Sequence, residues 1–232
     1  MNKQAQITQM FDDIAKTYDP INRILSVRQD VLWRKNLSKL LPNNKALEIL
    51  DVATGTGDVC FSMCEERSNI TKAIGVDVSA NMLTYAQKKL EKSHLQNKIK
   101  FLLQDATSLE FADNSFDVVS IAFGIRNVVD KNKALQEFYR VLKPGGQLLV
   151  LEFSLPSNTY IKAIYLSYFR YVLPLLGGLI SGQKKAYSYL NQSVEEFVRK
   201  EDFLKSLEKN NFRELSFMPL SFSIAGIYRG FK

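Results

Sequence analysis

A glycine pair that could hold a nucleotide-like ligand occurs at Gly55-Thr56-Gly57, just after an apolar run that ends at Val52. Glycine at both positions lets the backbone approach a ligand closely, where a side chain would block it. A dinucleotide fingerprint requires a third glycine three residues after Gly57, and Cys60 stands there instead. The segment therefore favours a nucleotide-type ligand and makes nicotinamide binding the weaker interpretation.

Two aspartates end the next two apolar runs along the chain. Asp77 closes Gly75-Val76-Asp77, and Asp105 follows Gln104. An acidic residue at the end of the second strand of a nucleotide-binding fold accepts hydrogen bonds from ribose hydroxyls, so Asp77 is expected to accept two. Asp105 taken alone can simply cap a turn, but as part of this set a contact with adenine is favoured.

The elements that must position these residues alternate regularly. Strands are expected at 46–52, 72–78, 99–104, 116–123 and 147–153, and helices at 59–67, 80–93 and 131–142. Such alternation predicts an α/β fold with a mostly parallel sheet and helices on both faces. A helix at 201–209 and two strands at 213–217 and 222–229 bring the expected sheet to seven strands.

The length of 232 residues fits one α/β domain, 1–232, with an insertion. Within it we expect an N-terminal helical cap (1–44), a cofactor-binding core (45–153), a substrate lid (154–200) and a C-terminal helix with two strands (201–232). The lid is expected because the alternation stops there and an aromatic and aliphatic stretch follows. The cap contains a basic amphipathic helix at 31–41.

Composition limits the partners and the compartment. The net charge of +7 indicates an anionic partner, which can be nucleic acid, an acidic lipid surface or an anionic substrate. Cys60 and Cys64 fall in one predicted helix without further ligands, so we expect buried thiols and no metal site. The N-terminus has no apolar signal-peptide region, and no apolar run approaches the roughly 20 residues that span a bilayer. A cytoplasmic location is expected.

Three motifs in this order resemble the class I S-adenosylmethionine methyltransferases, whose fold is Rossmann-like. They are Leu50-Asp51-Val52-Ala53-Thr54-Gly55-Thr56-Gly57, Gly75-Val76-Asp77 and Arg140-Val141-Leu142-Lys143-Pro144-Gly145-Gly146. The resemblance implies S-adenosyl-L-methionine as cofactor, with Gly55, Thr56 and Gly57 around its methionine end. It also implies Asp77 on the ribose, Asp105 and Ala106 near adenine, and Ala122 in the cofactor site.

A narrower resemblance covers almost the whole chain. It is carried by Ile121-Ala122-Phe123-Gly124-Ile125-Arg126-Asn127-Val128, by Leu151-Glu152-Phe153-Ser154, and by motifs near both ends, including Phe11-Asp12, Tyr18-Asp19, Ala186-Tyr187 and Arg229-Gly230-Phe231-Lys232. These residues resemble the ubiquinone/menaquinone biosynthesis C-methyltransferase family. Arg28 and Gln183 depart from the family pattern, which puts local substrate contacts in doubt but not the reaction class.

The resemblance implies methylation of a ring carbon of an isoprenoid quinol. Demethylmenaquinol is the first choice, and 2-polyprenyl-6-methoxy-1,4-benzoquinol of the ubiquinone route is the alternative. The implied partners are the quinol and, peripherally, an anionic membrane at its inner face, with a homodimer as a possible assembly. A nucleic-acid methyltransferase is the remote alternative, because neither an Asn-Pro-Pro-Tyr type motif nor a Pro-Cys nucleophile is present.

The chemistry suggests roles for five residues. Methylation at carbon needs a phenolic oxygen that loses its proton, and Arg126 at the end of the fourth strand can stabilise the phenolate, with a surface arginine as the alternative interpretation. Tyr187 is expected in the catalytic site. Tyr18, Asn127 and Tyr189 are expected to bind the substrate, although lid tyrosines often only pack and Tyr18-Asp19 can instead cap a helix.

Overall fold

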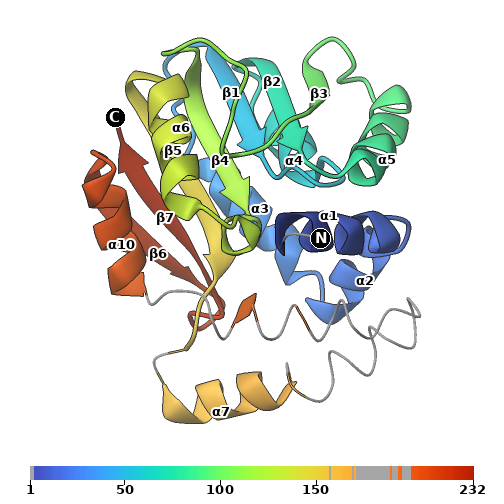
Figure 1. Cartoon of the computed structure of the whole chain (residues 1–232), viewed down its shortest axis with the longest axis vertical. Helices are drawn as coiled ribbons and strands as arrows, with labels where there is room; N and C mark the ends of the chain where they lie inside the picture. Colours follow the sequence, from blue (N-terminus) through green and yellow to red (C-terminus); the bar gives the residue numbers. More distant parts are fainter. Residues whose placement is uncertain (1–2, 157, 169, 171–188, 190–192, 195–199) are drawn as a thin grey trace.

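Seven strands form one sheet in the order β3-β2-β1-β4-β5-β7-β6 (Figure 1). The computed structural model describes residues 3–156, 158–168, 170, 189, 193–194 and 200–232. The strands are β1 (Leu47–Val52), β2 (Ile70–Asp77), β3 (Ile99–Leu103), β4 (Phe116–Ala122), β5 (Leu142–Phe153), β6 (Arg213–Leu220) and β7 (Ala225–Phe231). The predicted mostly parallel, seven-stranded sheet is confirmed.

The order of the strands creates the place where a ligand can bind. β1 pairs in parallel with both β2 and β4, so the chain runs outward from β1 to β3 and then returns to the other side of β1. Loops that leave β1 and β4 therefore diverge, and this switch point is where open α/β sheets bind ligands. β7 pairs antiparallel with both β5 and β6, which accounts for the mixed edge of the sheet.

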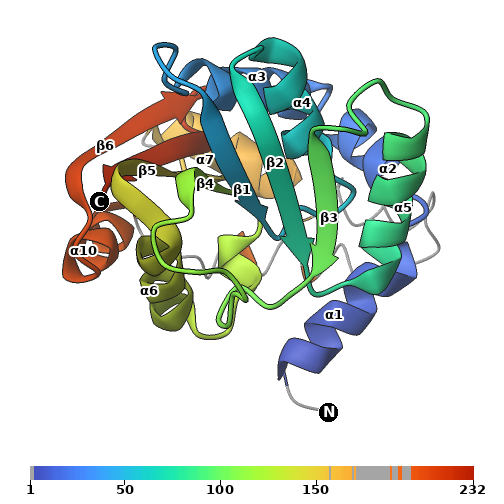
Figure 2. The same cartoon turned by 90° about the horizontal axis from the view of Figure 1, so that it is seen from above.

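Helices cover both faces of the sheet, as the alternation predicted (Figure 2). One face is covered by α3 (Gln29–Lys39), α4 (Asp58–Glu66) and α5 (Ala80–Glu91), which contribute Leu37, Met63 and Leu90 to a buried core. On the other face, α6 (Lys131–Val141) and α10 (Lys200–Lys209) contribute Phe138 and Phe203. The central strands β1 and β4 are buried on both faces, which is why their sequences read as apolar runs.

The N-terminal part of the chain, expected as a helical cap, contains two helices in addition to the expected basic one. Before α3 stand α1 (Lys3–Ile14) and α2 (Tyr18–Leu25), which lie at the end of the sheet (Figure 1). Their apolar residues Ile14, Ile21 and Leu25 pack with Met82 of α5 and with Tyr165 of α7 (Thr159–Ser167). Only a minority of positions in α1 and α2 are buried, and most of their residues are polar or charged. The apolar periodicity of these two short helices is therefore weak in the sequence.

Several element boundaries also differ from expectation. The last strand begins at Ala225 instead of 222, because Ser221, Phe222 and Ser223 form a turn with φ of 45°, 57° and 67°. Three consecutive left-handed residues do not keep the extended conformation of a strand, so the hairpin turn takes positions 222–224 that were expected in the last strand. α3, Gln29–Lys39, is the expected basic helix but begins and ends two residues before the expected 31–41, and its apolar residues Trp33 and Leu37 are buried in the core.

Candidate active site

Two adjoining cavities lie at the carboxyl edge of the parallel strands. The smaller, about 80 Å³, is lined by Gly55, Asp77, Asp105 and Ala106, among others. The larger, about 360 Å³, extends below α2 and α3 and is lined by Arg126 and several aromatic side chains. The residues that line both cavities are Phe11, Tyr18, Ala53, Gly55, Ala122, Phe123 and Asn127. The expected cofactor residues and the expected substrate residues thus meet at a shared wall.

The two glycines after β1 have different functions in the structure. Gly57 has a φ of +82°, and a Cβ there would lie 2.5 Å from Cζ of Phe101, so this glycine is required by packing. Gly55 has a φ of +56°, and a Cβ there would meet nothing within 4 Å. Its N–H donates to Oδ2 of Asp77 at 2.8 Å. The space beside Gly55 therefore fits a ligand that approaches the backbone closely.

Replacing Gly55 with alanine should lower cofactor affinity about tenfold, because a new methyl group and a strained backbone would lie where the ligand approaches. Gly145→Ala is a matched control, since Gly145 has a φ of +73°, open space at its Cβ and a position remote from both cavities. Both variants should lose roughly 1 kcal/mol of stability from backbone strain. Calorimetric titration and thermal unfolding measure the two effects, and equal cofactor affinities for the two variants would refute the assignment.

Asp77 is placed to hold a ribose. Its buried carboxylate accepts hydrogen bonds from the N–H groups of Ser79 at 2.9 Å and Gly55 at 2.8 Å. Each carboxylate oxygen can accept more than one hydrogen bond, so capacity remains for hydroxyl groups in the smaller cavity. Burial raises the pKa of Asp77, and the backbone N–H groups oppose that rise. The residues present therefore fit the sugar of the expected cofactor.

Asp105 adopts the arrangement of a turn cap. Its Oδ1 accepts hydrogen bonds from the N–H of Thr107 at 2.7 Å and from the Thr107 hydroxyl at 2.8 Å. Asp105 and Ala106 also line the smaller cavity. The two interpretations considered for Asp105 are therefore compatible, and its contact with adenine remains a proposal.

Asp51, near the end of β1, is a buried acid. It belongs to the motif 50–57, but the sequence alone indicated no function for it. It accepts hydrogen bonds from the hydroxyls of Thr54 at 2.6 Å and Ser120 at 2.7 Å. Burial is the largest cause that raises the pKa of Asp51, from 3.8 to about 7. Through its hydrogen bond with Thr54, the side chain holds the loop that precedes Gly55. Its raised pKa means that it gains or loses a proton near neutral pH.

Asp51→Asn should flatten the dependence of stability on pH. Between about pH 4 and pH 7 the folded protein keeps a proton on Asp51 that the unfolded chain has released, so the free energy of unfolding falls as the pH rises through this window. The neutral amide has no such loss and should be more stable than wild type at pH 8, by up to on the order of 4 kcal/mol. Thermal unfolding at pH 5 and pH 8 tests this, and parallel pH profiles would contradict it.

Charged and polar side chains connect α2 and α3 to the glycine loop, residues 53–57, and to the start of α4. Asp58, at the start of α4, lies 2.8 Å from Nη2 of Arg23, 3.2 Å from Nη2 of Arg34 and 2.6 Å from Nζ of Lys89. Asp19 accepts a hydrogen bond from the Thr56 hydroxyl at 2.6 Å. Arg34, a basic residue of α3, is thus paired within the protein and is not available to an external anion. No local sequence pattern indicates this cluster, because its members come from four different helices that meet only in the folded protein.

Arg126 follows β4 in a short 3-10 turn, Ile125–Asn127, and lines the larger cavity. Its Nη1 donates to the Phe123 carbonyl at 2.7 Å and to Oε1 of Glu152 at 2.6 Å. The exposed fractions of the Arg126 and Glu152 side chains are 4% and 0%. Its guanidinium also stacks over the Phe153 ring, 5.1 Å from the centroid.

The structure adds a partner for Arg126 that the sequence interpretation did not name. The missed residue is Glu152, and its signal was a single acidic residue inside the apolar run 147–153. Burial raises the pKa of Glu152, while Arg126 opposes that rise. The alternative that Arg126 is a surface arginine is wrong, since its side chain is buried.

The expected substrate residues lie around the shared wall. Tyr18 and Asn127 line both cavities, and the Tyr189 hydroxyl donates to Oδ1 of Asn127 at 3.2 Å. Burial raises the pKa of Tyr18, so its hydroxyl stays protonated and able to donate a hydrogen bond. Tyr187 lies outside the residues that the structure describes. Ala53 and Phe123 follow directly after β1 and β4 and have φ of 51° and 55°, and such strain is typical of functional sites.

Comparison with solved structures agrees with the fold. The chain is similar to an S-adenosylmethionine-dependent methyltransferase from Thermotoga maritima, a possible histamine N-methyltransferase, with a TM-score of 0.68 and 20% identity over 97% of this chain and 99% of that one. It is also similar to phosphoethanolamine N-methyltransferase 2 of Haemonchus contortus in complex with S-adenosyl-L-methionine. That match has a TM-score of 0.62 and 18% identity, and covers 84% of this chain and 51% of the other.

Relatives found by sequence comparison share a higher sequence identity with this chain than these solved structures do. A demethylmenaquinone methyltransferase of Bacteroides fragilis is 40% identical over 99% of this chain and 94% of its own length. A ubiquinone/menaquinone biosynthesis C-methyltransferase of Geobacter sulfurreducens is 42% identical over 99% and 90%, respectively. A demethylmenaquinone methyltransferase of Thermus thermophilus is 43% identical over 95% and 99%. The ubiE/COQ5 methyltransferase family model matches residues 1–232, and the chain therefore belongs to this family.

Proposed function

We propose that this methyltransferase transfers a methyl group from S-adenosylmethionine to a ring carbon of demethylmenaquinol. The observation that supports the proposal most directly is the junction of the two cavities at Tyr18, Phe123 and Asn127. A cofactor held by Gly55 and Asp77 would present its methyl group at this junction. The larger cavity is rich in aromatic and aliphatic side chains, as an apolar ring system requires. Two of the relatives described above are named for this substrate.

Bound S-adenosylmethionine supplies a methyl group on a positively charged sulfur, which is already a strong electrophile. The chain's own residues need only align a carbon nucleophile with it and exclude water. The ring carbon becomes nucleophilic when the neighbouring phenolic oxygen loses its proton. After this carbon has accepted the methyl group, it releases its own hydrogen as a proton, which restores the aromatic ring. We assign stabilisation of that oxygen to the guanidinium of Arg126, which Glu152 and the Phe123 carbonyl hold in one orientation. No covalent intermediate with the protein is needed.

Two polar residues are suited to orient the ring. The Tyr18 hydroxyl can donate to a quinol oxygen, and burial keeps it protonated. The Asn127 amide, which accepts from the Tyr189 hydroxyl, can contact a second oxygen. Tyr187 remains our proposal for handling the proton that the phenol releases.

We further propose that the protein acts on the cytoplasmic side of a membrane, as a peripheral protein. No described helix is long and apolar enough to cross a bilayer. A polyprenyl quinol is itself held in the bilayer by its tail, so the enzyme and the lipid surface must meet. The net charge of +7 supports an anionic surface as the partner.

Incubation of the purified protein with methyl-labelled cofactor and each reduced quinol tests the function. We expect demethylmenaquinol to be methylated faster than 2-polyprenyl-6-methoxy-1,4-benzoquinol, which is the alternative substrate that the name of the Geobacter relative supports. The same two compounds in their oxidised form are the matched control, because they have no phenolic proton to release and should not react. Mass spectrometry of the product locates the label, and the absence of label in both reduced quinols would refute the proposal.

A further inference from the structure

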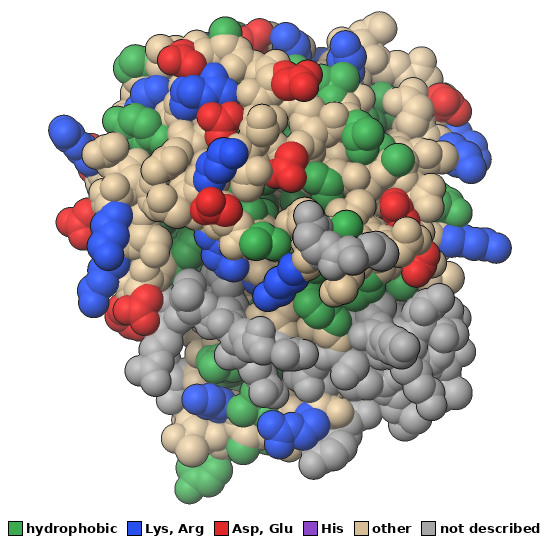
Figure 3. Space-filling view, viewed as in Figure 1, with side chains coloured by type: hydrophobic (Ala, Val, Ile, Leu, Met, Phe, Trp, Pro, Cys, Tyr) green, Lys and Arg blue, Asp and Glu red, His purple; other side chains and the backbone are tan. Residues whose placement is uncertain are grey.

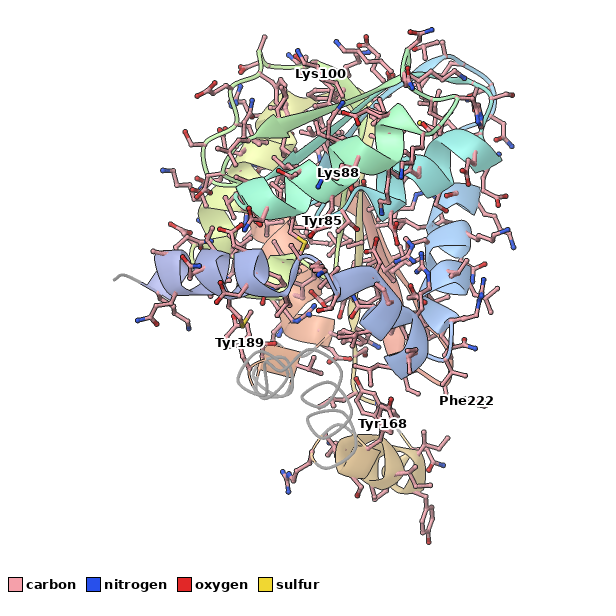
Figure 4. The ribbon with its side chains drawn as sticks, turned by 90° about the vertical axis from the view of Figure 1, so that its right-hand side faces the viewer. Tyr85, Lys88, Lys100, Tyr168, Tyr189 and Phe222 are labelled. Atoms are coloured by element: carbon pink, nitrogen blue, oxygen red, sulfur yellow. The ribbon has the colours of Figure 1, made fainter. Side chains whose placement is uncertain are left out.

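Large apolar side chains protrude into solvent at the end of the molecule where the larger cavity lies. The exposed fractions are 78% for Val27, 83% for Tyr160, 72% for Ile164 and 80% for Phe222. Val27 lies in the turn between α2 and α3, Tyr160 and Ile164 lie on α7, and Phe222 lies in the turn between β6 and β7. Figure 4 shows α7 and Phe222 together at the lower end of the molecule. We call these four side chains the apolar tips.

Contacts within the protein hold the three segments around one cavity. Val27 itself lines the larger cavity, and so do Ser221 and Tyr168, which flank the other two segments. The Ser221 hydroxyl accepts a hydrogen bond from Nε1 of Trp33 at 2.8 Å, which joins the β6–β7 turn to α3. The Tyr168 hydroxyl donates to the Leu25 carbonyl at 2.7 Å, which joins the end of α7 to α2. The apolar tips are therefore fixed beside the substrate cavity.

Neither packing nor turn preference explains why apolar residues occupy these turns. Val27 has a φ of 50° and Phe222 a φ of 57°. The left-handed conformation costs a non-glycine residue roughly 1–2 kcal/mol, and turns of this kind favour glycine or asparagine. Because both side chains are mostly exposed, no core contact offsets that cost. Strain of this kind points to a function outside the folded chain.

The charged side chains on the two turns and the helix that carry the apolar tips are cationic. The described residues 158–168 and 170, which include α7, contain Lys162 and Arg170 and no acidic residue. The α2–α3 turn carries Arg28, and the β6–β7 turn, Ser221–Ile224, carries no charge. Figure 3 shows Lys, Arg and hydrophobic side chains around α7, without acidic ones. Apolar side chains flanked by cations complement the hydrocarbon and the phosphates of an anionic bilayer.

From these observations we infer that the apolar tips insert into an anionic lipid bilayer and hold the substrate cavity against it. The inference rests on the proposed function and extends it, because it assigns the surface that meets the lipid. Separate protruding side chains suit a deformable lipid surface, whereas a protein partner requires a closely fitted area of about 800 Å². A quinol then enters the cavity between the tips, while its tail remains in the bilayer.

The test replaces the exposed side chains without disturbing the fold. Phe222→Asn suits the left-handed turn, and Tyr160→Gln with Ile164→Gln keeps α7 helical. The triple variant should bind phosphatidylglycerol vesicles at least tenfold more weakly than wild type in sedimentation at low salt. Leu103→Gln, a matched exposed apolar residue on the edge strand β3, which carries none of the apolar tips, should bind like wild type.

Activity assays separate this inference from the proposed function. The triple variant should methylate a tail-less quinol in solution at the wild-type rate and a long-tailed quinol in vesicles at least tenfold more slowly. Three results would each overturn the inference. The triple variant could bind vesicles as tightly as wild type does, wild type could fail to bind vesicles, or the triple variant could lose activity on the tail-less quinol. The inference would also be overturned if wild type formed a dimer in solution and the triple variant did not, since a second copy of the chain would then cover the apolar tips. If vesicle binding behaves as expected but wild type methylates no quinol, the proposed function fails instead.

Discussion

Arg126→Ala should slow methyl transfer about a hundredfold or more and leave cofactor affinity near the wild-type value. A fixed cation in a water-poor site lowers the energy of a developing phenolate, and removal of one such group costs rate by factors of this size. Arg126→Lys should retain part of the activity, because it keeps the charge but not the planar group that reaches Glu152 and the Phe123 carbonyl together. Single-turnover rates with reduced demethylmenaquinol and calorimetric cofactor titration give the two quantities.

The ion pair with Glu152 requires a second variant. Arg126→Ala alone leaves a buried carboxylate without its partner, which costs about 3–5 kcal/mol of stability. The double variant Arg126→Gln with Glu152→Gln removes both charges and retains groups that can form hydrogen bonds. It should therefore fold and bind the cofactor normally, yet show the same loss of rate. If it turns over quinol as fast as wild type, Arg126 is structural and does not stabilise the phenolate.

Asp77→Ala should weaken cofactor binding by about 1.5–3 kcal/mol for each charge-assisted hydrogen bond to ribose that is lost. The variant also removes the acceptor for the Gly55 N–H, so the glycine loop loses one of its supports. Asp77→Asn is the matched control, because it keeps the shape and one carbonyl oxygen but not the charge. Its loss should be smaller. Calorimetry on the folded variants measures both, and an unchanged affinity for Asp77→Ala would disprove the ribose assignment.

The pH dependence of wild-type binding provides a second test of Asp77. Its pKa is raised by burial, so it takes up a proton at a higher pH than an ordinary aspartate does. Protonation removes the charge that strengthens the bonds to ribose. Cofactor affinity should therefore fall as the pH is lowered through the raised pKa, and Asp77→Asn should lack this fall.

The sequence determined the features that depend on neighbours along the chain. Apolar runs and breaks gave the α/β alternation, since strand and helix patterns are local. They also placed Gly55, Asp77 and Arg126 at strand ends, and strand ends of a parallel sheet meet at one edge. The two buried cysteines, Cys60 and Cys64, were likewise expected from their helix, and the structure confirms them as buried free thiols.

Other features were decided only when distant segments packed together. The Arg126–Glu152 pair joins residues 26 positions apart, and the Arg23–Asp58 pair joins residues 35 positions apart. The raised pKa of Asp51 depends on burial, and burial is a property of the assembled core and not of a motif. The apolar tips at Val27 and Phe222 read locally as ordinary core residues. Only the tertiary structure exposes them, because tight left-handed turns direct them away from the core and bring them beside the same cavity.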